Sequence, residues 1–307
     1  MAAITSANVA SAIVKLVAAD ALPVLVGNLV MGNLVNRNYE PALAQAGDTI
    51  NVPIPPVMVA NNILEGGTVQ TQNPDLGNAA IVLNTHAEAT FQIPDVTKVL
   101  AVPDLLKIYM QPAVAAIAQR VESDLLNLYA GFTANSPVGT AGTTITEAVI
   151  DAAETALFLS KIPASDQKFI VVDAATYSAW RQIPRFSEFQ TAGDAGLHAL
   201  VDGTIGKVKD FFVFRSQFVP KTTSTGSNPV TTTHNLAFAR DAIGLVVRRL
   251  PQPMPGTGAI AEYAELGNFG MRVVMSYHPD TLAQQFTVDV LYGCGILRNS
   301  SGVQVNT

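Results

Sequence analysis

Residues 81–93 read IVLNTHAEATFQI, a stretch in which apolar and polar side chains alternate. A period of two predicts a β-strand with one apolar and one polar face. At about 3.3 Å per residue this strand would reach roughly 40 Å, whereas most strands have about 5–6 residues. The sequence therefore predicts an unusually long extended element here.

A second, shorter strand precedes it. Residues 47–55 read GDTINVPIP, which also alternates, and prolines suit the edge or end of a sheet. No lysine or arginine lies between Arg37 and Lys98, so a ribbon of these strands lacks the charges that protect free edges. An isolated two-stranded ribbon is marginally stable in water. We therefore expect another copy of the chain to cover its edges and its apolar face.

The composition points the same way. The chain has 307 residues, of which 49% are hydrophobic and 14% charged, against about 25% charged in ordinary soluble domains. Much of its surface is therefore expected to face other protein. The longest apolar stretch, 21–36, is interrupted by Asn28 and Asn33 and is too short for a membrane span. It also lacks the features of a signal peptide, which predicts a cytoplasmic origin.

Charge and cysteine content exclude further classes. A formal charge of −6 argues against a dedicated nucleic-acid binder but suits a container for DNA. The single cysteine, Cys294, cannot form an internal disulfide or contribute to a thiol cluster for zinc.

The remaining chain predicts a mixture of helices and strands. A long helix is expected over 103–130, kinked or restarted at Pro112, and a capped helix is announced by Thr144 and Glu147 after a glycine-rich spacer. Further expected elements are an N-terminal helix carrying Val9, Ile13, Val14 and Val17, strands 168–172, 208–214, 236–238 and 243–248, a helix over 174–182, a polar loop over 222–233, and a hairpin of 269–277 with 286–292. The N-terminal helix suits either an ordinary terminus or an arm on a neighbouring subunit.

Several residues could carry chemistry. His86 and Glu88 share one strand face, but His86-Ala87-Glu88 lacks the paired cysteines of a zinc deaminase, and a polar face at a subunit contact is the preferred interpretation. Cys294 could act as a nucleophile with His86, His198, His234 or His278, yet a cysteine between two glycines is more often a packing residue.

Two other patterns are weak. Residues 256–261, GTGAIA, fit a dinucleotide fingerprint, but they follow a proline-rich stretch where that motif requires a strand. Arg248 and Arg249 could face DNA or pair with acids of a neighbour. We predict no catalytic, cofactor-binding or metal-binding residue, and no cofactor.

The order of elements resembles the Hong Kong 97 fold of tailed-bacteriophage major capsid proteins over nearly the whole chain. The resemblance rests on GDTINVP at 47–53, FQIPD at 91–95, the helix at 112–126, GKVKDFFV at 206–213 with Ser216, HNLAFARDAI at 234–243, and LYG at 291–293.

It implies an α+β fold with an N-terminal arm (1–46), an extended loop (47–95), a peripheral domain with a spine helix (96–143) that returns as a β-hairpin (251–307), and an axial domain (144–250). It also implies hexamers and pentamers of an icosahedral shell around double-stranded DNA, assembled in the host cytoplasm and located in the virion. Expected partners are sister subunits, a portal protein, a separate scaffolding protein, possible decoration protein and weakly bound DNA. Because no long helical leader precedes the arm, assembly is expected to use a separate scaffolding protein or none. The extended loop has no lysine, so no covalent cross-link is expected.

Two other functions stay open. An encapsulin-like nanocompartment shell would share the fold but enclose enzyme cargo. An α/β hydrolase or transferase would need convergent polar residues in a pocket, and no motif places them.

Overall fold

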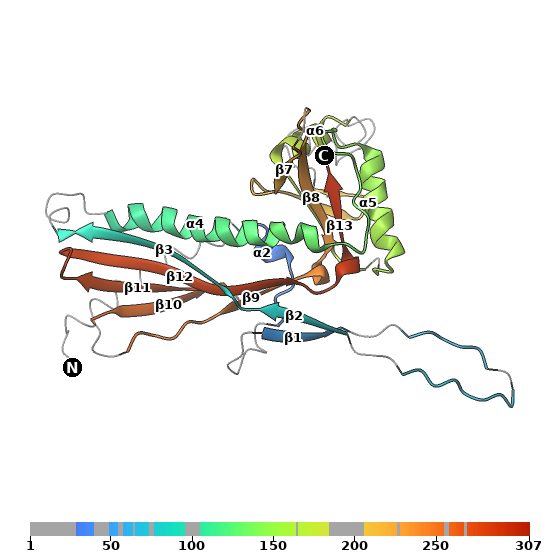
Figure 1. Ribbon diagram of the computed structural model, residues 1–307, viewed down its shortest axis with the longest axis horizontal. Coiled ribbons are helices and arrows are strands. Elements are labelled where there is room, and N and C mark those ends of the chain that lie inside the picture. The colour runs from blue at the N-terminus through green and yellow to red at the C-terminus, as the bar shows by residue number, and fades with distance from the viewer. Residues whose placement is uncertain are drawn as a thin grey trace.

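The computed structural model describes residues 29–39, 49–54, 58–63, 65–73, 77–95, 105–163, 165–183, 206–225, 228–254, 258–266 and 269–307. These residues form two lobes (Figure 1). The long lobe is a five-stranded sheet with one helix lying along it, and the short lobe is a six-stranded sheet with two helices. A separate two-stranded ribbon projects beside their junction. The N-terminal helix expected around Val9 lies outside the described residues.

The long lobe is built around β12 (Ala283–Ile296). One edge of β12 pairs with β11 (Phe269–His278) and then with β9 (Ile243–Arg248), and β10 (Ile260–Leu266) pairs with β11. All these pairs are antiparallel, so the predicted hairpin of 269–277 with 286–292 is confirmed.

The other edge of β12 pairs with β3 (Thr85–Pro94), from Thr85 opposite Tyr292 to Pro94 opposite Ala283. The single long strand predicted over 81–93 is therefore wrong: β2 (Gly77–Val82) pairs with β1 (Thr49–Ile54), and the chain leaves both strands at Leu83 and Asn84.

The prediction that another copy of the chain covers the apolar face of this ribbon is also wrong for β3. The apolar side chains Ala87, Ala89 and Phe91 join the core of the chain's own long lobe, and Phe91 stacks on Phe286 with ring centroids 5.5 Å apart. The alternation identified the two faces correctly. It could not identify β12 as the partner strand, because β12 lies far away in the sequence. Thr90 and Thr287, for example, are in contact although 197 positions separate them.

Helix α4 (Leu105–Asn127) covers this apolar face and ends in a 3-10 turn (Leu128–Gly131). Of the predicted stripe of Val114, Ile117, Val121, Leu125 and Leu128, the first four side chains are buried and Leu128 packs half-buried against the same core. The helix runs through Pro112, so the predicted restart is wrong. Ile108 and Pro112 are exposed, and water can therefore satisfy the carbonyl that the proline leaves without a donor. No helix among the described residues is both long enough and apolar enough to span a membrane.

The short lobe orders its strands β13, β8, β4, β6, β5, with β7 pairing β8. Their bounds are β4 Lys168–Val172, β5 Lys207–Val208, β6 Phe211–Arg215, β7 Lys221–Thr223, β8 Thr231–Ala239 and β13 Gly302–Asn306. Helices α5 (Glu147–Leu159) and α6 (Ala174–Arg181) pack on this sheet, and every residue of β4 is buried.

Three local predictions in the short lobe are wrong. The strand expected over 208–214 is broken by a turn at Lys209 and Asp210, because the buried Lys168 amine binds Asp210 at 2.6 Å. The loop expected over 222–233 contains a hairpin of β7 and β8. Thr146, not Thr144, precedes α5 as its N-cap, and Glu147 lies 3.7 Å from the Lys209 amine.

Glu122 of α4 joins the lobes to the N-terminal segment. This carboxylate is 1% exposed and accepts hydrogen bonds from the Met31 amide (2.8 Å) and the Ser216 hydroxyl (3.0 Å). Met31 begins the short helix α2 (Met31–Leu34), and Ser216 directly follows β6. Burial raises the pKa of Glu122, although these hydrogen bonds oppose the rise.

The raised pKa predicts a pH-dependent stability. A carboxyl group whose pKa rises on folding stabilises the fold below its ordinary pKa of 4.5, and this contribution is lost as the pH rises through the folded-state value. The Glu122→Gln variant should therefore gain stability relative to wild type as the pH rises above 4.5. Urea midpoints of unassembled subunits measure the difference, with Glu154→Gln on α5 as control. Parallel profiles for wild type and Glu122→Gln would contradict the raised pKa.

Candidate assembly surface

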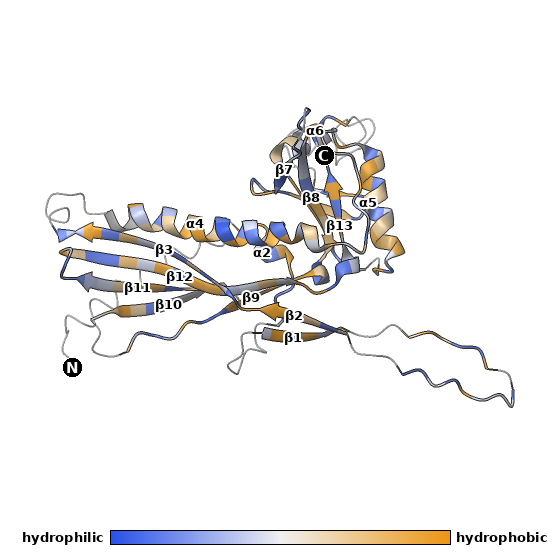
Figure 2. Cartoon of the chain, in the orientation of Figure 1, coloured by the Kyte–Doolittle hydropathy of each residue, from blue (hydrophilic) through white to orange (hydrophobic). Residues whose placement is uncertain are grey.

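Between β1 and β2, the described residues 58–63 and 65–73 of the extended loop stand away from both lobes (Figure 1). Residues 58–63 and 65–71 are all exposed, and Glu65 is the charged residue among them. Large apolar side chains here lie in solvent: Met58 is 62% exposed, Val59 64%, Ile63 56% and Val69 76%. Figure 2 shows apolar colouring on this loop far from either lobe. A soluble chain rarely gathers such surface without a partner to bury it.

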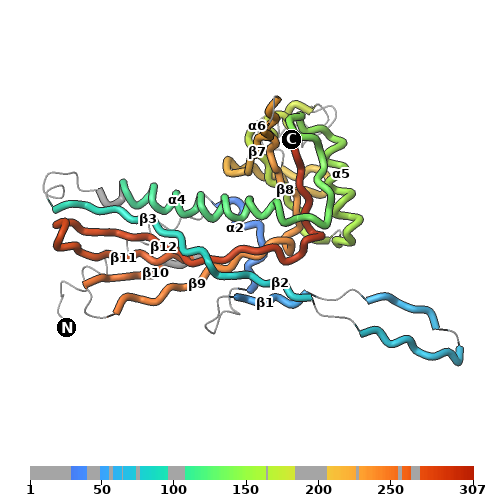
Figure 3. The backbone as a smooth tube through the Cα atoms, in the orientation of Figure 1, coloured from blue at the N-terminus to red at the C-terminus, as the bar shows by residue number. Residues whose placement is uncertain are grey.

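The base of the loop is firmly packed. Ile50 and Val52 of β1 and Ala79 and Ile81 of β2 form one apolar face, which is buried against Val246 and Leu297. The ribbon therefore rests on the end of the long sheet where β9 and β12 meet. Figure 3 shows the two limbs of the loop continuing outward from this base.

Glycine permits the close approach at this base. A Cβ atom on Gly293 of β12 would lie 2.4 Å from the Val82 carbonyl oxygen and 3.2 Å from the Leu83 Cα. Gly293 follows Tyr292, the last β12 residue that pairs with β3. Before this point the chain pairs with β1 as strand β2, and after it the chain pairs with β12 as strand β3. The change of partner strand explains the break at Leu83 and Asn84.

Gly293→Ala should disturb this crossing. The added methyl group meets backbone atoms that cannot rotate away, so we expect a loss of about 1–3 kcal/mol in unfolding free energy, as for overpacked interiors. Gly295→Ala is the matched control, because its Cβ would meet the Ala80 carbonyl oxygen at an ordinary 3.5 Å. Urea denaturation of unassembled subunits measures both. Equal effects of the two substitutions would rule out this role for Gly293.

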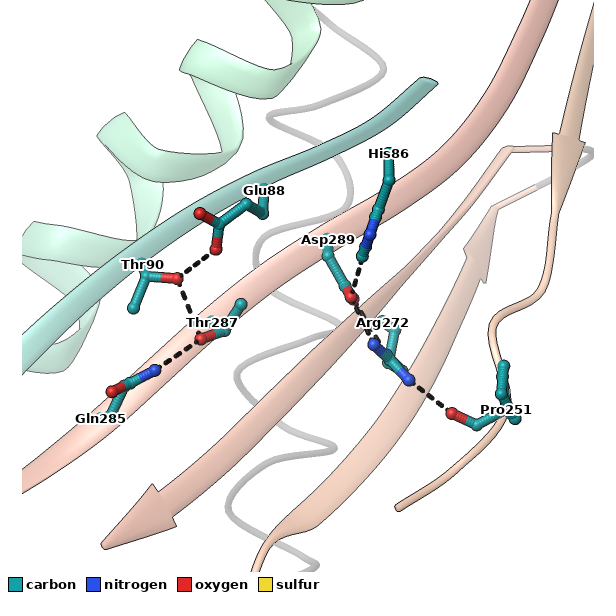
Figure 4. Close-up of polar contacts among 8 residues, drawn as sticks. All are labelled: His86, Glu88, Thr90, Pro251, Arg272, Gln285, Thr287 and Asp289. Atoms are coloured by element: carbon teal, nitrogen blue, oxygen red, sulfur yellow. Dashed lines mark hydrogen bonds and ion pairs between the residues drawn. The ribbon is translucent and has the colours of Figure 1, made fainter. Parts of the chain in front are cut away.

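His86 and Glu88 lie on the face of the long sheet away from α4 (Figure 4). The His86 Nε2 atom lies 2.9 Å from the Asp289 Oδ2 atom, and Asp289 also binds Arg272, whose Nε atom donates at 3.0 Å. Arg272 further donates to the Pro251 carbonyl. Asp289 is buried and pairs with two basic side chains, so this cluster joins β3, β12 and β11.

Glu88 binds a different partner. It accepts a hydrogen bond from Thr90, which contacts Thr287 on β12 at 3.0 Å (Figure 4). Gln92 likewise donates to Gln285 at 3.1 Å. The polar face predicted as a subunit contact carries cross-strand contacts within the chain's own sheet, and the subunit contact itself stays a prediction.

Asp289→Asn should destabilise the long lobe. It leaves the guanidinium of Arg272, whose side chain is 17% exposed, without its carboxylate, and breaking such a pair costs about 3–5 kcal/mol. Glu88→Gln on the opposite strand should change stability by about 0.5 kcal/mol or less. Thermal unfolding of unassembled subunits compares them, and a neutral Asp289→Asn would contradict the structural role of the pair.

The other candidate residues are not brought together as a catalytic set. Burial raises the pKa of Cys294 to about 11, which keeps the thiol protonated and a poor nucleophile. His234 stacks on Tyr129 and lies 3.0 Å from the Asn306 side-chain oxygen, while His278 ends β11 on the surface. His198, Gly256 and Thr257 lie outside the described part of the chain.

The two arginines that the sequence suggested could face DNA or a neighbour lie at the end of β9 and directly after it. The Arg249 guanidinium lies 4.5 Å above the Tyr263 ring, and Arg248 ends β9 half-buried. Within the described ranges no group of three or more histidine, cysteine or acidic side chains could hold a metal ion.

Sequence reasoning missed the residues that shape this surface. Asp289 and Arg272 lie opposite each other only after β11 and β12 pair, and Glu122 meets Met31 and Ser216 only after distant segments pack together. Gly293 was noted in the LYG motif, but its contact with Val82 depends on the path of a distant strand.

Comparison with known proteins supports the fold directly. No protein-family model and no curated protein matches the sequence. A solved structure of Mycobacterium phage Che8 is 18% identical, with 90% of each chain covered and a TM-score of 0.65. The capsid of cyanophage P-SCSP1u is 16% identical, covering 90% of this chain and 87% of that chain, with a TM-score of 0.61. A virus-like particle from Pyrococcus furiosus is 10% identical, covering 95% and 98%, with a TM-score of 0.54.

At these identities the similarity establishes the fold. The chain has the α+β fold of phage capsid structures, so the predicted Hong Kong 97-type fold class is confirmed.

Proposed function

We propose that this chain is the major capsid protein of a tailed bacteriophage, which assembles into hexamers and pentamers of an icosahedral shell around double-stranded DNA. The observation that carries the proposal is the extended loop, which holds Met58, Val59, Ile63 and Val69 in solvent on a fold otherwise found in phage capsids. Sister subunits of a shell would bury these side chains, which no other described part of the chain covers.

The proposal assigns the parts of the chain. Residues 1–46 form the arm, 47–95 the extended loop, 96–143 and 251–307 the peripheral domain, and 144–250 the axial domain. The protein acts by assembly and not by catalysis. Its further partners are a portal protein, a separate scaffolding protein, a decoration protein where one exists, and packaged DNA held by weak contacts. It is assembled in the host bacterial cytoplasm and resides in the virion.

The direct experiment is electron microscopy of the purified protein at increasing concentration. We expect closed particles with pentameric and hexameric units, and a single-chain band on a denaturing gel because the loop lacks lysine. A folded protein that stays monomeric at every concentration would refute the proposal.

A nanocompartment shell is the second candidate, favoured by the similarity to the virus-like particle from Pyrococcus furiosus. Nuclease-resistant DNA inside native particles supports the phage function, whereas enclosed protein without DNA supports the nanocompartment. An enzyme would lose its activity on substitution of His86 or Cys294, and a shell protein should still assemble after each change.

Loop variants test the surface itself. Burying one valine side chain contributes about 1.5–3 kcal/mol, and 1.4 kcal/mol corresponds to a factor of ten. Val69→Ser should therefore raise the concentration needed for assembly by about tenfold or more. Thr71→Ser in the same limb is the control, because it removes one methyl group from a polar position. Light scattering measures the threshold, and circular dichroism checks that each subunit stays folded.

A further inference from the structure

The two limbs of the extended loop are joined by a side chain. The β1–β2 ladder ends where Ile54 pairs with Gly77, and residues 58–63 and 65–73 form no strand. Thirteen residues apart, Val59 and Gln72 nevertheless make two hydrogen bonds. The Val59 amide donates to the Gln72 Oε1 atom at 3.0 Å, and the Gln72 amide group donates to the Val59 carbonyl.

This arrangement imitates a β-ladder. A primary amide carries one acceptor and two donors, so it can exchange a pair of hydrogen bonds with a backbone residue as a residue of an opposite strand does. Within the described residues of the loop, no backbone-to-backbone hydrogen bond joins the limbs. Gln72 therefore supplies a backbone-like link beyond the end of the ladder.

We propose that Gln72 is a positioning residue that keeps the limbs together in the free subunit and so prepares the loop to dock on a second copy of the chain. This inference rests on the proposed shell function for its consequence, but not for the link itself. A loop that is already ordered avoids part of the entropy cost that a flexible loop incurs on binding. The side chains that gain are Met58, Val59 and Val69, which lie beside the link in sequence.

The first test measures the loop in unassembled subunits. Millisecond hydrogen–deuterium exchange should show the Val59 amide exchanging about tenfold faster in Gln72→Ala than in wild type, because two modest hydrogen bonds are lost. Gln72→Glu keeps the acceptor for the Val59 amide but loses the donor to its carbonyl, and should fall between them. Gln70→Ala is the matched control: Gln70 is the same residue type two positions away in the same limb, it is exposed, and no hydrogen bond of Gln70 is found among the described residues. Equal exchange in wild type and Gln72→Ala would overturn the proposal.

The second test measures assembly. Gln72→Ala should raise the assembly threshold by about tenfold, and Gln70→Ala should leave it unchanged. Equal thermal midpoints of the subunits separate this effect from a loss of folding. Faster exchange with an unchanged threshold would overturn the positioning role. If wild type never assembles, the proposed function fails, and the exchange measurement alone decides whether Gln72 holds the loop.

Discussion

The backbone of β2 crosses that of β12 at Gly293, where the Val82 carbonyl leaves no room for a side chain. This contact fixes the direction in which the β1–β2 ribbon leaves the long lobe. The ribbon then buries Ile50, Val52 and Ile81 beneath its base, so the extended loop begins from a rigid support. Everything that the exposed limbs can reach depends on that starting angle.

Much of the fold could be predicted from the sequence because it rests on local periodicity. The stripe from Val114 to Leu125 and the alternation in 269–277 and 286–292 identified the long helix and the central hairpin. The alternation of 81–93 also identified faces correctly, but a period of two says nothing about which strand or helix covers them. The partners β12 and α4 come from other parts of the chain, so the break at Leu83 could not be foreseen.

The sequence predicted that a protein-covered surface exists in this region, but not which residues form it. A stretch without lysine or arginine and with scattered apolar residues indicated a region that other protein covers. The residues that stand in solvent are 58–63 and 65–73, however, and not β3. The supports of the structure are long-range polar contacts: Glu122 with Met31 and Ser216, and Asp289 with Arg272 and His86. Such pairs follow from the packed fold, because no spacing in the sequence brings their members together.

The strength of one loop contact sets how the proposed shell would form. Burying Met58, Val59, Ile63 and Val69 would contribute on the order of 6–12 kcal/mol, at about 1.5–3 kcal/mol for each side chain. The loss of translational and rotational freedom on association costs about 4–15 kcal/mol, which is of similar size. A single loop contact would therefore hold two subunits weakly. A subunit that docks its own loop and receives a neighbour's loop loses that freedom once but gains both contacts, so closed rings and shells are favoured over isolated pairs.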